Sequence, residues 1–374
     1  MKIALVTPRF HTYLYYRIKA IEKAGHMVKV FALYKGVSEY HKNMDVTIVN
    51  ESLFFRMISK LFKIFKKTYL KSDLELKLMS PGKIFTKKII NYKPDLILVE
   101  SFMDVLLHKT IKLAKKINTK IIILLVSKKN NIKGSVLLLK LYLSFLKRNN
   151  VISYITPIKI NEVLYNELGI TNIHYLPLVF PAEDFNKLYF RNNRINIISV
   201  GKFVKRKEQI LLLKVINNLK DKYGLYLTLI GEKSDLDYLN EINNYINQNN
   251  LNKIVDIKYN ITYEKILNEY KKYDIFILPS YNEPVGYVIN EAMANKLPVI
   301  CADDCGGRCY IEEGRNGYIF KTRDENSLLS NIEKVIKNKN NIIKMGNTSF
   351  EFSKKRHSID IFGKNFNRVL QLYY

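Results

Sequence analysis

Residues 273–300 of the chain read YDIFILPSYNEPVGYVINEAMANKLPVI. The apolar run at 275–278 has the length of a buried strand, and a second short run follows at 298–301. Between the two runs, a helix is expected to begin near Val288. Short strands separated by a helix are typical of a parallel sheet with covering helices, so the segment predicts an α/β fold.

The same alternation extends outward through the chain. Further strands are expected at 3–6, 28–33, 96–99, 121–126, 151–155, 195–200, 225–230, 254–257 and 318–320. A length of 374 residues exceeds one ordinary core. Pro177 and Pro181, with the polar run after them, mark a boundary. We therefore predict two doubly wound, Rossmann-like domains, at 1–180 and 190–355, with a last helix at about 356–374 that packs back on the first.

The charge of the chain is its most unusual bulk property. Against 61 Lys and Arg residues stand 34 Asp and Glu residues, which gives a formal net charge of +27. Such a charge indicates an anionic partner: nucleic acid, an acidic membrane surface or phosphorylated substrates. The high Lys, Asn and Ile content also fits an AT-rich coding sequence, so part of the excess needs no partner.

Residues 53–71, LFFRMISKLFKIFKKTYLK, form an amphipathic pattern that combines an apolar face with basic residues and no acid. Its apolar members at helical spacing are Phe54, Met57, Ile58, Leu61, Phe65 and Tyr69. A basic helix of this kind is typical of binding to an anionic membrane surface. A core-facing helix of a Lys-rich protein fits the pattern equally well. Residues 136–145, followed by Lys147 and Arg148, are a weaker second case.

Apolar runs such as 121–126 fall far short of the roughly 20 residues that a spanning helix needs. The start of the chain lacks the apolar region of a signal peptide. We therefore expect a cytoplasmic protein. Cys301, Cys305 and Cys309 fit that compartment as reduced thiols, because their spacing matches no common zinc or cluster motif.

Two glutamates follow the strand at 275–278. Glu283 lies in the loop, Gly286 allows a ligand to approach the backbone closely, and Glu291 lies about one turn into the next helix. The first amides of that helix favour phosphate. The Glu291 carboxylate can accept hydrogen bonds from the vicinal hydroxyls of a ribose.

A basic loop, GKFVKRK at 201–207, follows the strand at 195–200. In a doubly wound sheet it lies at the same edge as Glu283, since ligands bind at the carboxyl ends of the strands. We expect Lys202 and Lys207 to neutralise a diphosphate there, with Lys205 and Arg206 as further cations.

These motifs together resemble the GT-B-fold glycosyltransferases of family 4. The resemblance covers the C-terminal half: Glu283 and Glu291 as the Glu-x7-Glu pair, Gly201 to Lys207 as the diphosphate loop, and the landmarks at 229–232, 273–280 and 306–317. It implies two domains facing a central cleft, and transfer of a sugar from a nucleotide-diphosphate donor, UDP-sugar favoured, with retention at the anomeric carbon. It implies no cofactor and no metal.

The resemblance also implies residue roles. Glu283 would contact the transferred sugar or stabilise its developing positive charge, Glu291 would hold the ribose, and Lys202 and Lys207 would hold the diphosphate. Residues Tyr259 to Ile261 would meet the base through their backbone. The implied donor-binding set is Gly201, Lys202, Lys207, Gly231, Asn260, Ile261, Glu283, Gly286, Tyr287, Val288 and Glu291.

The N-terminal half departs from the family at two places. Its first loop, 8–11, lacks the paired glycines of many members, and Ser127 with two lysines stands where many place a catalytic His. His11 or Glu100, each just past a strand end, could supply the N-domain catalytic group instead. Both also fit ordinary loop positions.

Other functions fit the sequence less well. Asp235 with Asp237, or Asp303 with Asp304, would suit a metal-dependent transferase, but Asp235 stands where a helix cap is expected. A nucleic-acid- or membrane-binding protein without catalysis would explain the charge but neither glutamate. A nucleotide-sugar epimerase of the same fold matches the basic loop less well. The acceptor we expect is a lipid-linked saccharide in surface-polysaccharide assembly, reached from the inner face of the membrane, with no nucleic acid involved.

Reversing the charge of the basic stretch tests membrane binding. Replacing Lys60, Lys63, Lys66 and Lys67 by Glu should release the protein from anionic vesicles in a co-sedimentation assay, because the attraction of cations to an anionic surface is lost. Binding to neutral vesicles is the control. Undiminished binding of the variant to anionic vesicles would reject the membrane role of this stretch.

Overall fold

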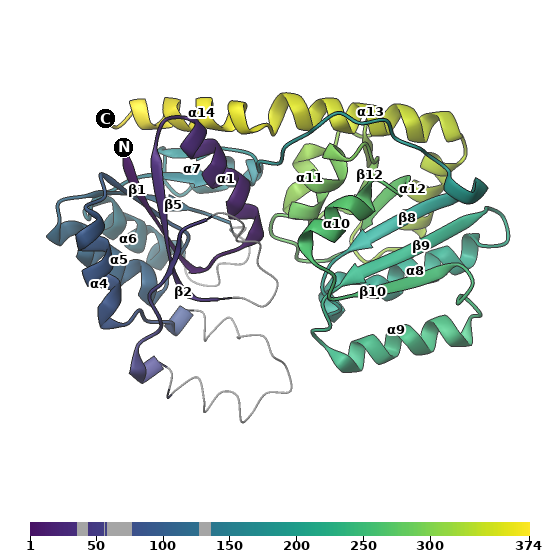
Figure 1. Cartoon of the computed structure of the whole chain (residues 1–374), viewed down its shortest axis with the longest axis horizontal. Coiled ribbons are helices and arrows are strands. Elements are labelled where there is room, and N and C mark those ends of the chain that lie inside the picture. The colour runs from purple at the N-terminus through teal and green to yellow at the C-terminus, as the bar shows by residue number, and fades with distance from the viewer. Residues whose placement is uncertain (36–43, 56, 58–76, 127–135) are drawn as a thin grey trace. The chain divides into compact units, whose positions relative to one another are not determined.

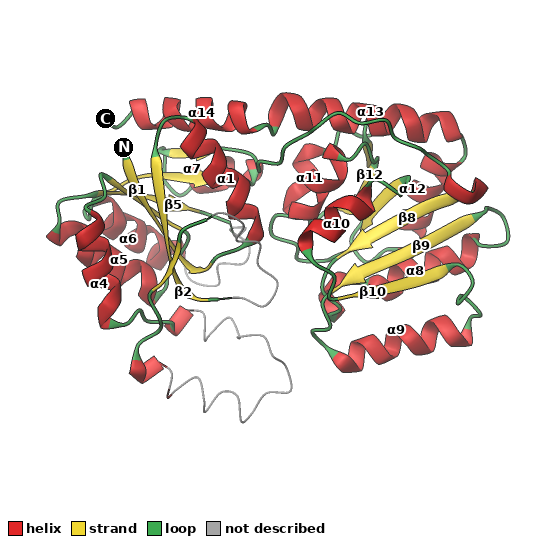
Figure 2. Ribbon diagram, in the orientation of Figure 1, coloured by secondary structure: helices red, strands yellow, loops and turns green. Residues whose placement is uncertain are grey.

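The computed structural model describes residues 1–35, 44–55, 57, 77–126 and 136–374. The chain divides into two compact units: Met1–Val179 together with Ile359–Tyr374, and Phe180–Ser358. Each unit is a parallel sheet with helices on both faces (Figures 1 and 2). Below, they are called the N-terminal and C-terminal units.

The sheet of the N-terminal unit has the order β3-β2-β1-β4-β5-β6-β7, and all neighbours run parallel. Its strands are β1 (Lys2–Arg9), β2 (Met27–Tyr34), β3 (Val46–Ile48), β4 (Leu96–Val99), β5 (Lys120–Leu124), β6 (Val151–Thr156) and β7 (Ile173–Tyr175). Its helices are α1 (Thr12–Lys23), α4 (Lys83–Tyr92), α5 (Val105–Lys116), α6 (Val136–Lys147), α7 (Lys159–Asn166) and α14 (Ile359–Gln371).

Alternate residues of these strands face two separate cores. Leu5 shares a buried cluster with Leu14 of α1 and Phe362 of α14. Val6 shares a different cluster with Phe85 of α4 and with residues of α5 and α6. Because side chains alternate across a strand, one apolar run supplies both faces, and the helices lie on either side of the sheet (Figure 1).

The C-terminal unit repeats this plan with the order β10-β9-β8-β11-β12-β13, again parallel. Its strands are β8 (Ile195–Val200), β9 (Leu225–Gly231), β10 (Val255–Tyr259), β11 (Ile275–Leu278), β12 (Val299–Ala302) and β13 (Gly317–Phe320). Its helices are α8 (Gln209–Leu219), α9 (Leu236–Gln248), α10 (Tyr263–Tyr270), α11 (Tyr287–Ala294), α12 (Glu325–Ile336) and α13 (Lys339–Arg356), with 3-10 turns η2 (Arg191–Asn193), η3 (Lys205–Lys207) and η4 (Gly306–Tyr310).

The predicted strands all occur, but β3 and β7 were not predicted and β1 extends beyond its predicted end. β3 and β7 are three-residue strands at the two ends of the sheet. Pro8 and Arg9, predicted as loop, continue β1 beside β2, whereas β4 pairs with β1 only as far as Val6. Pro8 therefore stands where β1 has one neighbour, and its missing N–H costs no bond to β4.

Most of the amphipathic stretch 53–71 lies outside the described residues, as does Ser127. Helical backbone is described at 53–55 and at 57. Among the described helices, none has the length and apolar character that crossing a bilayer requires.

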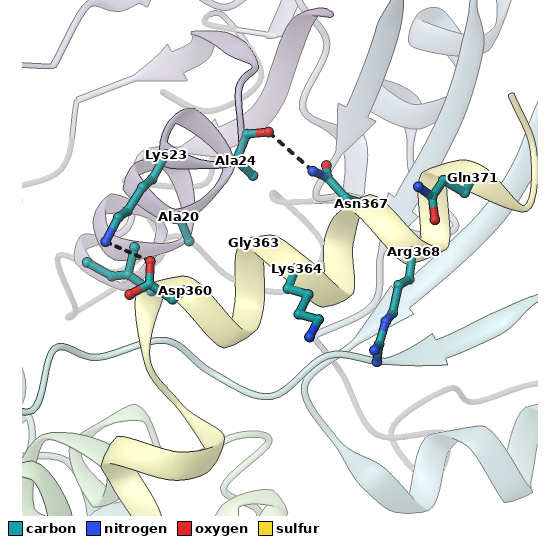
Figure 3. A pocket seen from close by; sticks show the side chains of 10 residues that line it. Ala20, Lys23, Ala24, Asp360, Gly363, Lys364, Asn367, Arg368 and Gln371 are labelled. Carbon is teal, nitrogen blue, oxygen red and sulfur yellow. Dashed lines mark hydrogen bonds and ion pairs between the residues drawn. The ribbon is translucent and has the colours of Figure 1, made fainter.

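Helix α14 packs against α1 within the N-terminal unit, and Figure 3 shows the contact at close range. Asn367 Nδ2 donates to the carbonyl of Ala24 (3.2 Å), and Lys23 pairs with Asp360 (2.6 Å). Gly363 lies so close to α1 that a Cβ there would stand 2.8 Å from the carbonyl oxygen of Ala20. A cavity of about 450 Å³ runs along this crossing.

The close crossing predicts that Gly363→Ala destabilises the N-terminal unit. The added methyl group would force α14 away from α1, at a cost of about 1–3 kcal/mol, as for other overpacked contacts. Urea unfolding measures the loss, and Lys364→Ala, at the exposed neighbouring position, is the control. Equal stability of the glycine variant and the wild type would contradict this account of the packing.

Candidate functional site

The candidate site lies where the winding of the C-terminal sheet reverses. From β8 the chain proceeds outward to β9 and β10, then returns to the other side of β8 to form β11, β12 and β13. Sheets of this kind bind ligands at the carboxyl ends of the strands beside such a reversal, which is where the loops after β8 and β11 lie. Lys202, Arg206 and Lys207 follow β8, and Glu283 follows β11.

Glu283 binds two cations of the β8 loop. Lys207 Nζ donates to its Oε2 at 2.5 Å, and an Arg206 guanidinium nitrogen donates to the same oxygen at 2.8 Å. The side chain of Glu283 is only 10% exposed and that of Lys207 12%, so water screens this ion pair weakly. Among the described residues, no hydrogen bond is made to Oε1.

Burial alone would raise the pKa of Glu283. The charges of Lys207 and Arg206 outweigh that effect and lower the pKa to about 2. Glu283 is therefore ionised throughout the physiological range. With two cations and one carboxylate, the cluster keeps a net positive charge that suits an anion.

Lys202 and Lys205 point elsewhere. Lys202 Nζ pairs with Glu232 at 3.1 Å, and Lys205 pairs with exposed Glu241 at 3.4 Å. Lys205, Arg206 and Lys207 together form the 3-10 turn η3, and its tight winding directs Arg206 and Lys207, but not Lys205, toward Glu283. Arg206 was predicted only as a further cation of the loop. In the structure it pairs directly with Glu283.

Gly286 shapes the start of α11. It adopts a left-handed conformation (φ 71°) as the N-cap residue, and a Cβ there would stand 2.8 Å from the Cys305 sulfur. A side chain at this position would thus be strained and would collide with its neighbour. Tyr287 and Val288 form the first turn of α11, which contains no acidic residue, so its amides remain suited to an anion.

Glu291 is held by two tyrosines that the sequence analysis did not identify. Tyr263 donates to its Oε1 and Tyr270 to its Oε2, each at 2.9 Å. Burial raises the pKa of Glu291 to about 7, although both tyrosine hydroxyls act to lower it. The tyrosines stand seven positions apart on α10, a spacing that puts them on one helix face. That spacing was the signal available in the sequence.

The remaining predicted donor residues lie at the ends of β9 and β10. Gly231 ends β9, and a Cβ there would stand 2.1 Å from the carbonyl oxygen of Gly201, so only glycine fits. Asn260 follows β10, donates its backbone N–H to the carbonyl of Gly231 (2.9 Å), and accepts from Lys233 N (3.1 Å). Ile261 is the next residue, half-buried before α10.

The N-terminal unit carries its own polar cluster where its sheet reverses, between β1 and β4. Thr7 Oγ1 lies 3.0 Å from Glu100 Oε2 and 2.8 Å from the carbonyl of Arg9. Arg9 contacts His11 Nδ1 at 3.0 Å. Burial raises the pKa of Glu100 to about 8, against the opposing effects of Thr7 and Arg9. His11 and Glu100 thus follow neighbouring strands, and their catalytic roles stay predictions.

The alternative metal residues have structural partners. Asp235 caps α9 by accepting from Tyr238 N (3.1 Å), as predicted, and Asp304 accepts from Asn282 N (2.7 Å). Cys301 and Cys305 are buried free thiols. Within the described ranges, no group of three or more His, Cys, Asp or Glu side chains is placed to hold a metal ion.

Two cavities lie away from the Glu283 cluster. One is the cavity between α1 and α14, and the other, of about 560 Å³, lies along α13 beside Lys344, Phe352 and Arg356. The candidate site is therefore identified by its charged side chains and by its position at the reversal of the sheet.

The raised pKa of Glu291 predicts a pH-dependent cost to stability. Between the unfolded pKa of 4.5 and the folded value of about 7, the folded state keeps a proton that the unfolded state releases. Stability therefore falls as pH rises through this window, by about 3 kcal/mol at most. Glu291→Gln should remove that loss and raise the urea midpoint at pH 8 more than at pH 5.

Glu264→Gln, on the exposed side of α10, is the matched control and should change neither midpoint by much. A Glu291→Gln variant that is equally stabilised, or destabilised, at both pH values would contradict the assignment of the cost to Glu291.

Comparison with known proteins finds a family model that matches most of the C-terminal unit. Residues 181–352 match the model described as glycosyl transferases group 1. A lipopolysaccharide core biosynthesis glycosyltransferase, LpsE of Rhizobium meliloti, is 25% identical over 37% of this chain and 39% of its own length. Spore coat protein SA of Bacillus subtilis is 30% identical over 37% of this chain and 40% of its own length. The matched region thus spans about two fifths of the length of each of these relatives.

A solved structure extends the likeness to both units. The crystal structure of Anabaena Alr3699/HepE in complex with UDP has a TM-score of 0.73 and 13% identity, and covers 100% of both chains. At this identity the likeness concerns the fold alone. The chain has the GT-B fold, and its residues 181–352 are similar to the glycosyl transferases group 1.

Proposed function

We propose that this chain is a retaining, metal-independent glycosyltransferase of family 4 that takes its sugar from a nucleoside-diphosphate donor, most readily a UDP-sugar. The observation that carries the proposal is the cluster of Lys207, Arg206 and Glu283 at the reversal point of the C-terminal sheet. The group 1 match over residues 181–352 supports it. The HepE structure, which contains UDP, supports the choice of donor.

The charges of the site suit a departing diphosphate. In the proposed reaction, the bond between the anomeric carbon and the diphosphate oxygen breaks, and negative charge grows on the leaving group. Lys207 and Arg206 would stabilise that charge, with the amides at the start of α11 as further donors. Lys202 would join them by leaving Glu232, its present partner at 3.1 Å.

The carboxylate serves the other half of the same step. As the bond breaks, positive charge grows on the sugar ring, and ionised Glu283 would stabilise that charge. Its Oε2 accepts from both cations, so Oε1 would be the oxygen that receives a sugar hydroxyl. The acceptor hydroxyl would bond to the anomeric carbon on the face that the diphosphate leaves and pass its proton to the departing oxygen.

We further propose a saccharide acceptor, lipid-linked, in the assembly of a surface polysaccharide. The relative LpsE is described as a lipopolysaccharide core biosynthesis glycosyltransferase, which supports this class of acceptor. The net charge of +27 and the basic stretch at 53–71 suit work at the anionic inner face of a membrane.

UDP binding and donor cleavage test the proposal. UDP should bind the wild type in a calorimetric titration, and adding a chelator should leave the affinity unchanged. Glu283→Gln should bind UDP within about threefold of the wild type, because the cations remain. It should release UDP from UDP-glucose, UDP-galactose or UDP-N-acetylglucosamine at least about a hundredfold more slowly, because one preorganised charge is lost from the transition state.

Glu241→Gln is the matched control. Glu241 is exposed, pairs with Lys205 and lies apart from the Glu283 cluster. Its variant should therefore keep the full rate of donor cleavage. Retention is checked by the anomeric NMR signal of the first product. A Glu283→Gln variant with the wild-type rate, or a wild type that binds no UDP, would overturn the proposal.

A further inference from the structure

Two tyrosines of helix α10, Tyr263 and Tyr270, hold the carboxylate of Glu291 and are called the tyrosine frame. Tyr263 begins this helix and Tyr270 ends it, and two turns of helix separate them. Each hydroxyl donates to a different oxygen of Glu291, at 2.9 Å. Since seven residues rotate a helix by about 700°, both rings leave α10 on the same side. A single rigid element thus holds both ends of one carboxylate.

Burial makes this frame necessary. Tyr270 is fully buried and Glu291 is 9% exposed, so a carboxylate without donors there would be costly. The terminal torsion of a glutamate is broad and has no sharp preferred angle of its own. Two hydrogen bonds from fixed rings set that angle. An ionised carboxylate offers about four lone-pair sites, so one on each oxygen stays available to a ligand.

A lysine ties the frame to the helix that carries Glu291. Lys187 Nζ donates to the carbonyl of Tyr270 at the end of α10 (3.4 Å) and to the carbonyl of Asn295 at the end of α11 (2.9 Å). The carboxyl ends of both helices favour a cation. Lys187 therefore bridges the carboxyl end of α10, which carries Tyr270, and the carboxyl end of α11, which carries Glu291.

We propose that Tyr263 and Tyr270 are positioning residues that orient the Glu291 carboxylate toward the two vicinal hydroxyls of a ribose, so that the site selects ribonucleotides. This inference rests on the proposed function and on the ribose contact of Glu291 that the family resemblance implies. It adds the residues that give Glu291 its direction and the feature of the nucleotide that they select.

Paired titrations with UDP and with 2′,3′-dideoxy-UDP test the inference. The wild type should bind UDP at least about tenfold more tightly, because only UDP can donate to Glu291. Tyr263→Phe and Tyr270→Phe should each weaken UDP binding by about tenfold, the worth of a hydrogen bond to a charged group. Both variants should bind the dideoxy nucleotide within twofold of the wild type. A residue that merely stabilised the fold would affect both ligands equally.

Tyr273→Phe is the matched control. Tyr273 lies just after α10 and donates to Glu269 (3.4 Å), so its hydroxyl also serves a carboxylate but one outside the frame. This variant should keep the wild-type ratio of the two affinities. Tyr263 is half-buried, and its variant gives an answer even if loss of the buried Tyr270 hydroxyl prevents folding.

The outcomes separate the two proposals. Equal losses for both nucleotides in the tyrosine variants, or no loss in either, would overturn the positioning role. A wild type that binds both nucleotides equally would overturn the ribose contact while leaving a diphosphate site intact. If neither nucleotide binds the wild type, the proposed function itself fails.

Discussion

Strands β8 and β11 lie side by side, although β9 and β10 come between them in the chain. The crossovers that leave this pair run to opposite sides of the sheet. No connecting helix can close over both carboxyl ends at once, so side chains of the two loops are left to contact one another there and could contact a ligand. Glu283 contacts Lys207 and Arg206 because the loops that carry them end at this reversal. Gly286 and the helix α11 that carries Glu291 follow the same loop after β11.

Two buried glutamates of the same loop and helix have acquired opposite properties. Two cations pair with Glu283 and lower its pKa to about 2, whereas two tyrosine hydroxyls donate to Glu291 and its pKa rises to about 7. Both side chains are similarly buried, so the two pKa values differ because nearby cations offset the effect of burial at Glu283 but not at Glu291. Glu283 keeps its charge at the place where a reaction would develop an opposite one. Glu291 instead offers oriented acceptors, which is what hydroxyl recognition requires.

Much of this could be predicted from the sequence because the relevant signals are local. Apolar runs of four to six residues identified the central strands, including Leu96–Val99 and Ile195–Val200, since a buried parallel strand needs both faces apolar. Strand β3 escaped because a three-residue edge strand has no such pattern. The full length of β1 was not predicted either. A strand can include Pro8 only because β4 ends before it, and the sequence of β1 alone does not show where its neighbour ends.

The partners within the site were harder to predict for a related reason. The basic loop predicted several cations near the site. Which of them reach Glu283 depends on the 3-10 turn η3 and on Glu208, which follows η3 with a left-handed backbone. Neighbouring cations therefore point in different directions. The tyrosines of α10 precede Glu291 by 28 and 21 residues, and only the fold brings them together. Sequence gives the chemical groups, and tertiary structure decides their pairing.

The N-terminal unit applies the same reversal to a different chemistry. Glu100 and Thr7 meet between β1 and β4, and the pKa of Glu100 rises to about 8. The Thr7 hydroxyl has one hydrogen and two nearby acceptors, the carbonyl of Arg9 and Glu100. Thr7 is the donor in both contacts, and its hydrogen bond to Glu100 does not offset the effect of burial on the pKa of the carboxyl. If Glu100, rather than His11, supplies the catalytic group of the N-terminal unit, it would act near neutral pH as a donor of a proton or hydrogen bond. A role as the base that deprotonates an acceptor would require it first to lose a proton that its burial retains.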